Sequence, residues 1–434
     1  GATTIVNMYT PIACRTFVHA TVSKRHSCFA LGHIRDDGSG SAYNLLRFHK
    51  DKKLGGRLPG GGIIPTGFFR KAANDKGRAR LREKMQPFLE SFDTTNDGLR
   101  SILATRGLKV GDDVVVMVVN DGEADLFFNF ACSLSAYGLR HIMRRVLVFS
   151  GSAELVPLIK VTGAMAVSHE SFGKVSRGAS YGYLDSIFVD MMWYKAFSVY
   201  LLLRLGYNVL FQDVDLVWFR DPFEYFKRHT RPTKEHQPSA HVNSSNHLGI
   251  SPYPEAFFSD DGQRTLRYTP FYANSGFYYL LASARTEHFA WSVVTAFDIL
   301  QATGSHQNVF TMRLLEGLDL TRIHPKLLPL REFATGVMFH HNKTFMTGIQ
   351  AGTEHPYNFH MCWTANKADK LKNFKATSMW YLSKEADVRA LRPPHGKLYK
   401  WTKTISGPND DTRWKTVQKR LCSAMPDAPF QPQL

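Results

Sequence analysis

After an irregular first quarter, the chain alternates between two hydrophobic periods. Residues 114–119 form a continuous run of apolar and mostly β-branched residues, which is typical of a strand covered on both faces. Residues 124–137 carry apolar side chains three and four positions apart, which predicts a helix. The same pattern recurs as a strand at 145–149, a helix at 153–159 and a third strand at 164–167. This repetition predicts an α/β fold with a doubly wound, mostly parallel sheet flanked by helices.

The next strand is followed by two carboxylates. Residues 189–205 have helical apolar spacing, Gly206 is placed to end that helix, and 208–211 has the pattern of a buried strand. Asp213 and Asp215 come next, two positions apart, so both side chains point to the same side of an extended chain. Charges at the end of an apolar strand must be solvated, paired or metal-bound. The pair therefore predicts either a solvated turn or a site for Mn²⁺ or Mg²⁺, which prefer oxygen ligands.

Residues 206–222, GYNVLFQDVDLVWFRDP, resemble the signature of the nucleotide-diphospho-sugar transferases of glycosyltransferase family 77. That family includes plant and algal cell-wall arabinosyl- and xylosyltransferases, and the resemblance covers roughly 114–381. It implies a GT-A type fold with a single nucleotide-binding domain at 111–390. We expect 1–110 to be a stem or extension that packs on this domain, and 391–434 to be a C-terminal extension.

Two segments before the acidic pair are expected to contribute to the donor site. Asn120 and Asp121 end the first predicted strand, where the resemblance implies contacts to the uridine base or ribose. A turn chosen only for its geometry explains the same two residues. Lys195 lies on the largely apolar helix before the acidic pair, so a contact with the donor diphosphate or sugar competes with an ordinary exposed lysine.

Residues 272–279, YANSGFYY, are the second motif that matches the family. We expect an Asn-Ser-Gly turn whose Asn274 amide hydrogen-bonds the sugar; a hairpin turn beside core aromatic residues is the alternative. Gln307 matches the second residue of the family's Asp-Gln pair, so a contact with the donor sugar or the acceptor is implied. His306 replaces the aspartate of that pair, which puts any role that needs a carboxylate there in doubt.

The third matching segment begins at His360, with the sequence HMCWTANKADK. The resemblance implies that this imidazole, from a distant strand end, completes the coordination of the same cation. Taken alone, His360 is better explained as an ordinary hydrogen-bonded histidine, and the acidic pair and the lysines downstream are what favour the metal role. A lysine nearby would neutralise the diphosphate leaving group, and the sequence does not choose between Lys367 and Lys370. Cys362 stands where the family often has asparagine.

Three groups of residues make up the expected site. The expected metal ligands are Asp213, Asp215 and His360. The residues expected to contact the donor nucleotide or its sugar are Asn120, Asp121, Lys195, Asp213, Val214, Asp215, Ser275, Gly276, Lys367 and Lys370. The residues expected to act at the reacting sugar are Gln307, Asn274 and Lys195.

Composition adds information about partners and compartment. The chain has 434 residues, 44% of them apolar, as expected for a folded globular protein. Its net charge of +17 favours anionic partners such as a nucleotide diphosphate or an acidic polysaccharide. No RNA-binding aromatic motif accompanies the basic residues, so nucleic acid is not an expected partner. The five cysteines have no zinc-type spacing and leave at least one unpaired. The pattern of 226–263 predicts an acceptor-side insertion or mobile loop.

No apolar run is long enough to span a bilayer, and the first residues have no signal-peptide pattern. We therefore expect a type II membrane protein of the Golgi lumen whose N-terminal anchor has been removed. The sequons at Asn243 and Asn342 are compatible with this compartment.

Together these features predict a metal-dependent retaining glycosyltransferase. It would move a pentose such as arabinose or xylose, or galactose, from a UDP-sugar to a cell-wall glycoprotein or polysaccharide; the oligomeric state is left open. No carboxylate is evident in the sequence near Asn274 or Gln307, so a same-face displacement is expected rather than a double displacement. A catalytically inactive carbohydrate or nucleotide-sugar-binding protein of the same fold is the main alternative. A metal-dependent phosphohydrolase would need more converging carboxylates than the motifs supply.

Overall fold

The structure is a computed structural model. It describes residues 85–168, 186–230, 253–262, 272–296, 306–383 and 410–423, three strands before residue 50, and the isolated positions 83, 178, 179 and 300. The three early strands, β1 (Thr16–Thr21), β2 (Ser27–His33) and β3 (Tyr43–His49), form an antiparallel sheet of their own.

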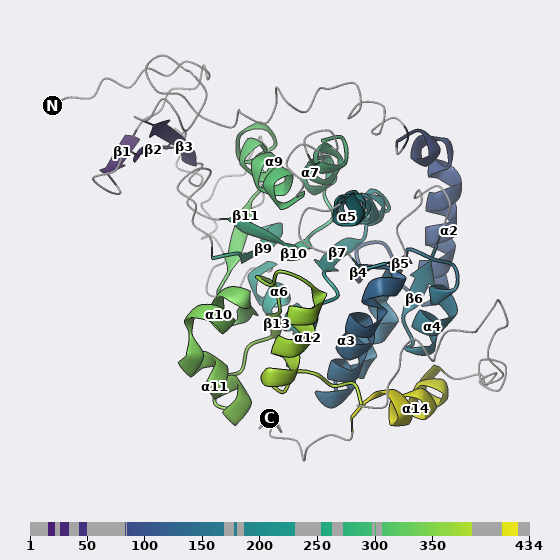
Figure 1. Ribbon diagram of the computed structural model, residues 1–434. Coiled ribbons are helices and arrows are strands. Elements are labelled where there is room, and N and C mark those ends of the chain that lie inside the picture. The colour runs from purple at the N-terminus through teal and green to yellow at the C-terminus, as the bar shows by residue number, and fades with distance from the viewer. Residues whose placement is uncertain are drawn as a thin grey trace, which may run out of the picture.

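A seven-stranded sheet forms the centre of the described part of the molecule (Figure 1). Six of its strands run in one direction, and β10 alone runs against its two neighbours. The order across the sheet is β11 (Pro325–Leu328), β9 (Ala256–Asp260), β10 (Ala273–Leu280), β7 (Asn208–Gln212), β4 (Asp113–Val119), β5 (Val146–Ser150) and β6 (Met165–Val167). The predicted mostly parallel, doubly wound sheet is therefore confirmed.

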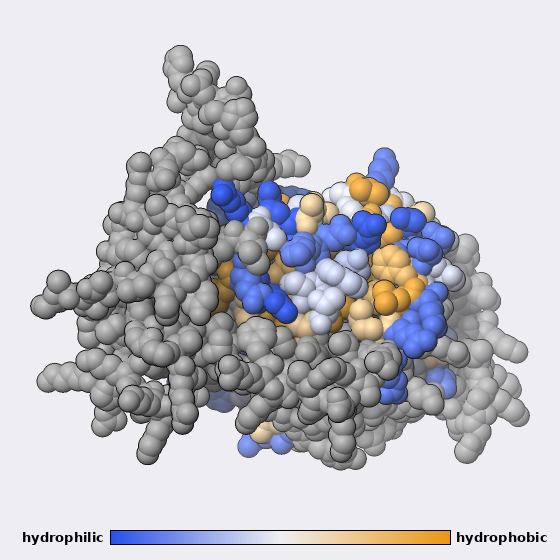
Figure 2. Space-filling view, turned by 90° about the horizontal axis from the view of Figure 1, so that it is seen from above, coloured by the Kyte–Doolittle hydropathy of each residue, from blue (hydrophilic) through white to orange (hydrophobic). Residues whose placement is uncertain are grey.

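Helices cover both faces of this sheet (Figure 1). One face packs against α2 (Phe92–Thr105), α5 (Ser186–Arg204), α7 (Ala284–Val294) and α9 (His306–Leu320). The other packs against α3 (Ala124–Ala136), α4 (Leu155–Val161), α6 (Pro222–Thr230) and α14 (Asp410–Leu421). Seen from above, hydrophilic and hydrophobic residues are interspersed on the described surface (Figure 2). Among the described residues, no helix combines the length and hydropathy that a membrane crossing requires.

A second, three-stranded sheet stands beside the first. It consists of β12 (Phe333–Thr335), β13 (Asn358–His360) and β8 (Leu216–Trp218), with β13 in the middle. The short helices α10 (Gly336–His341), α11 (Lys343–Ala351) and α12 (Lys367–Ala376) share an apolar cluster with it. This sheet matters because it joins the chain after the acidic pair to a segment far along the sequence.

Two expectations about local structure are wrong. The Asn-Ser-Gly motif is not a turn: it lies inside β10, where the register with β9 shifts between Asn274 and Tyr278. Residues 226–263 are not all loop, because they contain the buried strand β9; residues 231–252 and residue 263 of that range lie outside the described part. Both errors have one cause: glycine, serine and other polar residues around a short strand hide a pairing that is made with distant strands.

The order of the strands fixes where a ligand can bind. The chain adds β5 and then β6 on one side of β4, and returns through α5 to place β7 on the other side. At such a switch point the loops after β4 and β7 diverge and leave a crevice at the carboxyl ends of the strands. Asn120 follows β4 and Asp213 follows β7, so the predicted residues stand at this crevice.

A disulfide that the sequence could not assign joins the C-terminal part of the chain to this domain. Cys132 on α3 bonds to Cys422, which lies just beyond α14. The indole of Trp414 on α14 is buried and lies under the guanidinium of Arg140. Cys362 is a free thiol in the described part of the chain.

Candidate metal centre

Strand pairing brings together three residues that the sequence proposed as metal ligands. Asp213 and Asp215 occupy the short link between β7 and β8, and His360 is the last residue of β13. Because β13 pairs antiparallel with β8, His360 lies opposite Leu216, next to the acidic pair. The backbone fixes the link: Asp213 donates its N–H to the Gly276 carbonyl at 2.7 Å, and the carbonyl of Asp215 accepts from Met361 at 2.9 Å.

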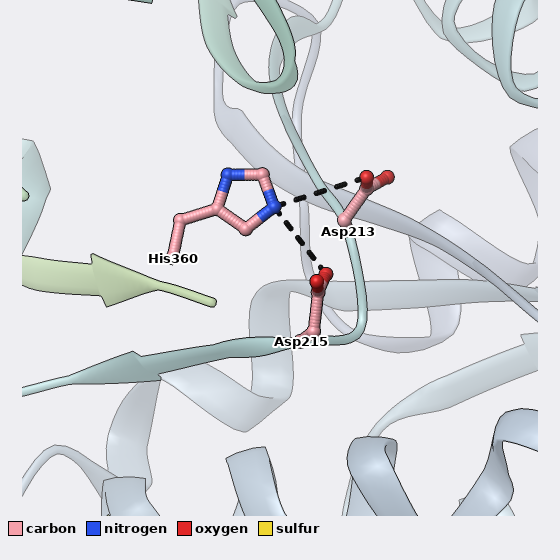
Figure 3. Close-up of side chains that lie close together, drawn as sticks. All are labelled: Asp213, Asp215 and His360. Atoms are coloured by element: carbon pink, nitrogen blue, oxygen red, sulfur yellow. Dashed lines mark ion pairs between the residues drawn. The ribbon is translucent and has the colours of Figure 1, made fainter. Parts of the chain in front are cut away.

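The three side chains converge (Figure 3). His360 Nε2 lies 3.3 Å from Asp215 Oδ1 and 4.0 Å from Asp213 Oδ2. One ligand atom from each residue lies within 4.8 Å of the others. Asp215 and His360 are buried, whereas the Asp213 side chain is 22% exposed. Two carboxylates and an imidazole are a donor set that suits Mn²⁺ and accepts Mg²⁺, so the residues fit the cation that the sequence predicted.

Two lysines hold the same carboxylates. Lys195 Nζ on α5 lies 2.6 Å from Asp213 Oδ1, and Lys370 Nζ on α12 lies 2.7 Å from Asp215 Oδ2. Burial alone would raise the pKa of the Asp215 carboxyl, but the Lys370 ammonium and the His360 imidazole together hold that pKa well below its usual range. Lysine is therefore part of this centre and not a solvated surface group.

The structure separates the two lysines that the sequence could not distinguish. Lys367, at the start of α12, bonds to the Asp125 carboxylate and to the Gly122 carbonyl. It therefore connects α12 to the segment after β4. Lys370, one turn later, contacts Asp215 instead. Of the two lysines, only Lys370 forms an ion pair with a residue of the candidate metal centre.

Gly276 lies directly against the centre. A Cβ atom built on it would stand 2.4 Å from His360 Cε1 and 2.7 Å from Asp213 Oδ2. Real Cβ atoms do not approach that closely, so a side chain here would displace two of the three candidate ligands. Glycine at 276 is thus required for the strand to lie this close to the two side chains, which explains why the motif has a glycine inside a strand.

Asn274 and a carboxylate that the sequence analysis missed lie beside Gly276. The Asn274 side chain accepts from Gly276 N at 2.8 Å and donates to Asp261 Oδ1 at 2.7 Å. Burial raises the pKa of Asp261 to about 6, although hydrogen bonds from Asn274 and Trp363 oppose this. The expectation that no carboxylate lies near Asn274 is therefore wrong. Asp261 directly follows β9, as Asp213 follows β7, and predicting β9 would have revealed it.

The side chains of the neighbouring residues Gln307 and His306 have different surroundings in the structure. Gln307 Oε1 accepts from the backbone N–H of Ser275 at 3.1 Å and lies 3.3 Å from its hydroxyl. His306 is 2% exposed and lines a small, largely apolar cavity together with residues of α5, α7 and β10. Burial lowers the pKa of His306 well below its usual value, and the Lys195 ammonium adds to the effect. This imidazole is therefore neutral and does not replace the carboxylate of the family pattern.

The residues after β4 have structural contacts of their own. Asn120 is 1% exposed; its side chain donates to the Gly178 carbonyl at 2.8 Å and accepts from Glu123 N at 3.0 Å. It thus caps the short 3-10 helix η1 (Asp121–Glu123) and holds the segment at 178 against it. A Cβ on Gly122 would meet the backbone of Ala179 at 1.9 Å, so this turn is also closely covered. Asp121 is half-buried beside them.

Val214, between the two acids, packs against two apolar clusters. One lies between the main sheet and the helices α3, α4, α6 and α14, and the other belongs to the small sheet. Its side chain therefore anchors the link and leaves the carboxylates on either side turned toward His360. The expected contact between Val214 and the donor nucleotide stays a prediction.

Comparison with known proteins gives a consistent result. Residues 141–374 match the family model described as nucleotide-diphospho-sugar transferase. Over 202 residues the chain is 25% identical to UDP-D-xylose:L-fucose alpha-1,3-D-xylosyltransferase 1 of Arabidopsis thaliana. The matched region covers 45% of this chain and 50% of that relative. The chain thus spans about half the length of this curated relative.

Solved structures show only a distant likeness. The bifunctional glycosyltransferase WbbM has a TM-score of 0.37 and 12% identity, covering 61% of this chain and 50% of its own. Mouse xyloside xylosyltransferase 1 has a TM-score of 0.31 and 12% identity, covering 59% of this chain and 99% of its own. At these scores the two structures add nothing to what the strand order and the site show.

Proposed function

The chain belongs to the nucleotide-diphospho-sugar transferase family, and from this premise we propose that it moves a sugar from a UDP-sugar to a hydroxyl group of a glycan or glycoprotein. One observation carries the proposal: Asp213, Asp215 and His360 converge at the carboxyl end of β7, beside the switch point of the sheet. A nucleotide diphosphate is the ligand that both this position and this donor set favour.

In this proposal Asp213, Asp215 and His360 hold Mn²⁺ or Mg²⁺. The cation would supply positive charge where negative charge grows on the leaving diphosphate. Lys370 supports the same function, because its ammonium already stands 2.7 Å from Asp215 and can turn to a phosphate oxygen. Lys195 is placed in the same way on the other acid, 2.6 Å from Asp213. A contact of either ammonium group with the diphosphate would favour the transition state over the ground state, since the diphosphate carries more charge as the sugar departs.

The donor sugar would lie over the first residues of β10. Asn274 and Ser275 are the second and third residues of this strand, and Gln307 reaches Ser275 from α9, so amide and hydroxyl groups gather there. We propose a pentose, with xylose first, because the Arabidopsis relative is described as using UDP-D-xylose. Arabinose and galactose remain in the donor panel below. His306 lines the apolar cavity and carries no carboxylate, so we assign it no contact with the sugar.

Retention through a same-face displacement is the proposed stereochemical course. Asp261 is a carboxylate near Asn274, yet its Oδ1 is engaged by the Asn274 amide at 2.7 Å. If Asp261 acted as the nucleophile of a double displacement, Asp261→Asn would lose transfer by the factor of roughly 10⁴ or more that removal of a nucleophile causes. We expect a much smaller loss, about tenfold or less, measured as the rate of sugar transfer.

The secretory pathway is the proposed compartment, with a cell-wall glycan or glycoprotein as acceptor. The Cys132–Cys422 disulfide supports an oxidising lumen, in which such bonds persist. The sequon asparagine Asn342 is half-buried and accepts from Phe345 N at the start of α11; Asn243 lies outside the described residues. The net charge of +17 fits an acidic polysaccharide.

The proposal is tested with a panel of UDP-sugars. Release of UDP and transfer of sugar to cell-wall oligosaccharides would be measured with Mn²⁺, with Mg²⁺ and with EDTA, and NMR would give the anomeric configuration of the product. We expect one preferred donor, loss of activity in EDTA, and retention. Asp215→Asn keeps the shape of the side chain and should reduce transfer at least about 100-fold. A protein that binds UDP-sugars but never releases UDP from them would instead be the inactive binding protein of the same fold.

A further inference from the structure

Each carboxylate of the candidate metal centre is shared between the imidazole and a lysine. Asp213 turns Oδ2 toward His360 Nε2 at 4.0 Å and Oδ1 toward Lys195 Nζ at 2.6 Å. Asp215 turns Oδ1 toward His360 Nε2 at 3.3 Å and Oδ2 toward Lys370 Nζ at 2.7 Å. The two ammonium groups come from different helices: Lys195 lies on α5, which packs on the main sheet, and Lys370 lies on α12, which packs on the small sheet.

These contacts balance the charge of the centre. Each carboxylate is paired with one ammonium group, so the charges of these two ion pairs cancel. Burial makes this balance effective, because the Asp215 side chain is 2% exposed, that of Lys195 is 11% and that of Lys370 is 28%. Solvent and salt therefore screen these charges weakly. A divalent cation bound alone would add its two positive charges beside two ammonium groups, and a diphosphate can compensate this charge.

We propose that Lys195 and Lys370 are built-in counter-ions that make the binding of a divalent cation depend on a nucleoside diphosphate. The inference rests on the proposed function, because it takes this centre to be the donor site. When a diphosphate is present, the two ammonium groups exchange carboxylate oxygens for phosphate oxygens and release the carboxylates for the cation. By thermodynamic linkage, the diphosphate and the cation then raise the affinity for each other by one common factor.

The test measures Mn²⁺ binding to the full chain, without reference to activity. Electron paramagnetic resonance detects free Mn²⁺, and titrations are made with and without UDP, after correction for Mn²⁺ that UDP binds in solution. Lys195→Met and Lys370→Met each remove an ammonium group and keep an apolar stem. Lys372→Met, at an exposed position of α12, is the matched control for the change in net charge.

We expect both substitutions to increase the affinity for Mn²⁺, which the loss of a merely structural lysine would not do. Without UDP, each of the two variants should bind Mn²⁺ at least about fivefold more tightly than the wild type, at the lower end of typical coupling between sites. The factor by which UDP tightens Mn²⁺ binding should fall correspondingly. Lys372→Met should stay within about twofold of the wild type, because solvent screens an exposed charge. Unchanged or weaker Mn²⁺ binding in a folded Lys195→Met or Lys370→Met variant would overturn the inference.

A ligand series tests the same point in the unaltered protein, in case a methionine variant fails to fold. Uridine, UMP and UDP carry increasing phosphate charge, and their effect on Mn²⁺ affinity should increase in that order. An equal effect of uridine and UDP would overturn the inference. Lys370→Arg keeps the charge and should keep the wild-type dependence on UDP; loss of that dependence would also count against it. Failure of the proposed function gives a different result: a wild type that binds no Mn²⁺ even with UDP, or that binds both and transfers nothing.

Discussion

Asp261 offers a direct test of how burial acts on a single group. The residue is 6% exposed, and burial raises the pKa of its carboxyl group from 3.8 to about 6. A raised pKa means that the folded state disfavours the ionised form, so folding loses stability as the pH rises from about 4 to about 6. At about 1.4 kcal/mol for each pKa unit, the cost above pH 6 is roughly 3 kcal/mol.

Asp261→Asn removes this cost and keeps an oxygen for the Asn274 amide, which donates to Asp261 Oδ1 at 2.7 Å. We therefore expect the variant to be more stable than the wild type at pH 8, by up to about 3 kcal/mol. At pH 4 the difference should nearly vanish, because the wild-type carboxyl is then protonated in the folded state.

Urea denaturation at pH 4, 6 and 8 gives the free energy of unfolding of both proteins, and only their difference is used. Asp97→Asn is the control, since its side chain on α2 is 73% exposed and surface changes usually stay within about 0.5 kcal/mol. A stability difference that is the same at pH 4 and pH 8, or a variant less stable than the wild type at pH 8, would refute the reasoning. Either result would mean that hydrogen bonding, and not burial, dominates at Asp261.

Three further outcomes are expected. Gly276→Ala should weaken Mn²⁺ binding in the presence of UDP by about 10-fold or more, because its Cβ would stand 2.4 Å from His360 Cε1; unchanged affinity in a titration would contradict the packing. Cys132→Ser should lower the free energy of unfolding by up to about 5 kcal/mol, since the disulfide to Cys422 closes a separation of 290 residues; a reducing agent should reproduce the loss in the wild type and leave the variant unchanged. Phe211→Ala, at a fully buried position of β7, should cost about 3 to 5 kcal/mol in urea denaturation, and a loss below about 1 kcal/mol would show that the site collapses around the cavity.

Much of the fold could be predicted because its strands are marked by local pattern. Four predicted strands became β4, β5, β6 and β7, and the three helices predicted between them became α3, α4 and α5. Parallel strands covered on both faces are continuous apolar runs, and the helices between them carry a stripe, so each unit is visible without its neighbours. β9 escaped prediction because five residues in a polar setting give no period, and only pairing with β10 and β11 stabilises them.

In the candidate site too, some residues could be recognised from the local sequence and others only from the paired strands. Asp213 and Asp215 are recognisable because two charges directly after an apolar strand are costly without a partner. His360 could be named from the family resemblance, but its distance from the acids depends on β13 pairing with β8. The choice of Lys370 over Lys367 depends on which side of α12 faces Asp215.

By itself, the sequence determined a doubly wound sheet, an acidic pair at its carboxyl edge, and membership in a family of sugar transferases, since each of these is written in neighbouring residues. Only the tertiary structure decided which lysines balance that pair, that Asp261 lies beside Asn274, and that Cys132 bonds to Cys422. The physical reason is that charge balance, burial and disulfide pairing depend on distances between segments that are far apart in the chain, and those distances exist only after the strands have paired.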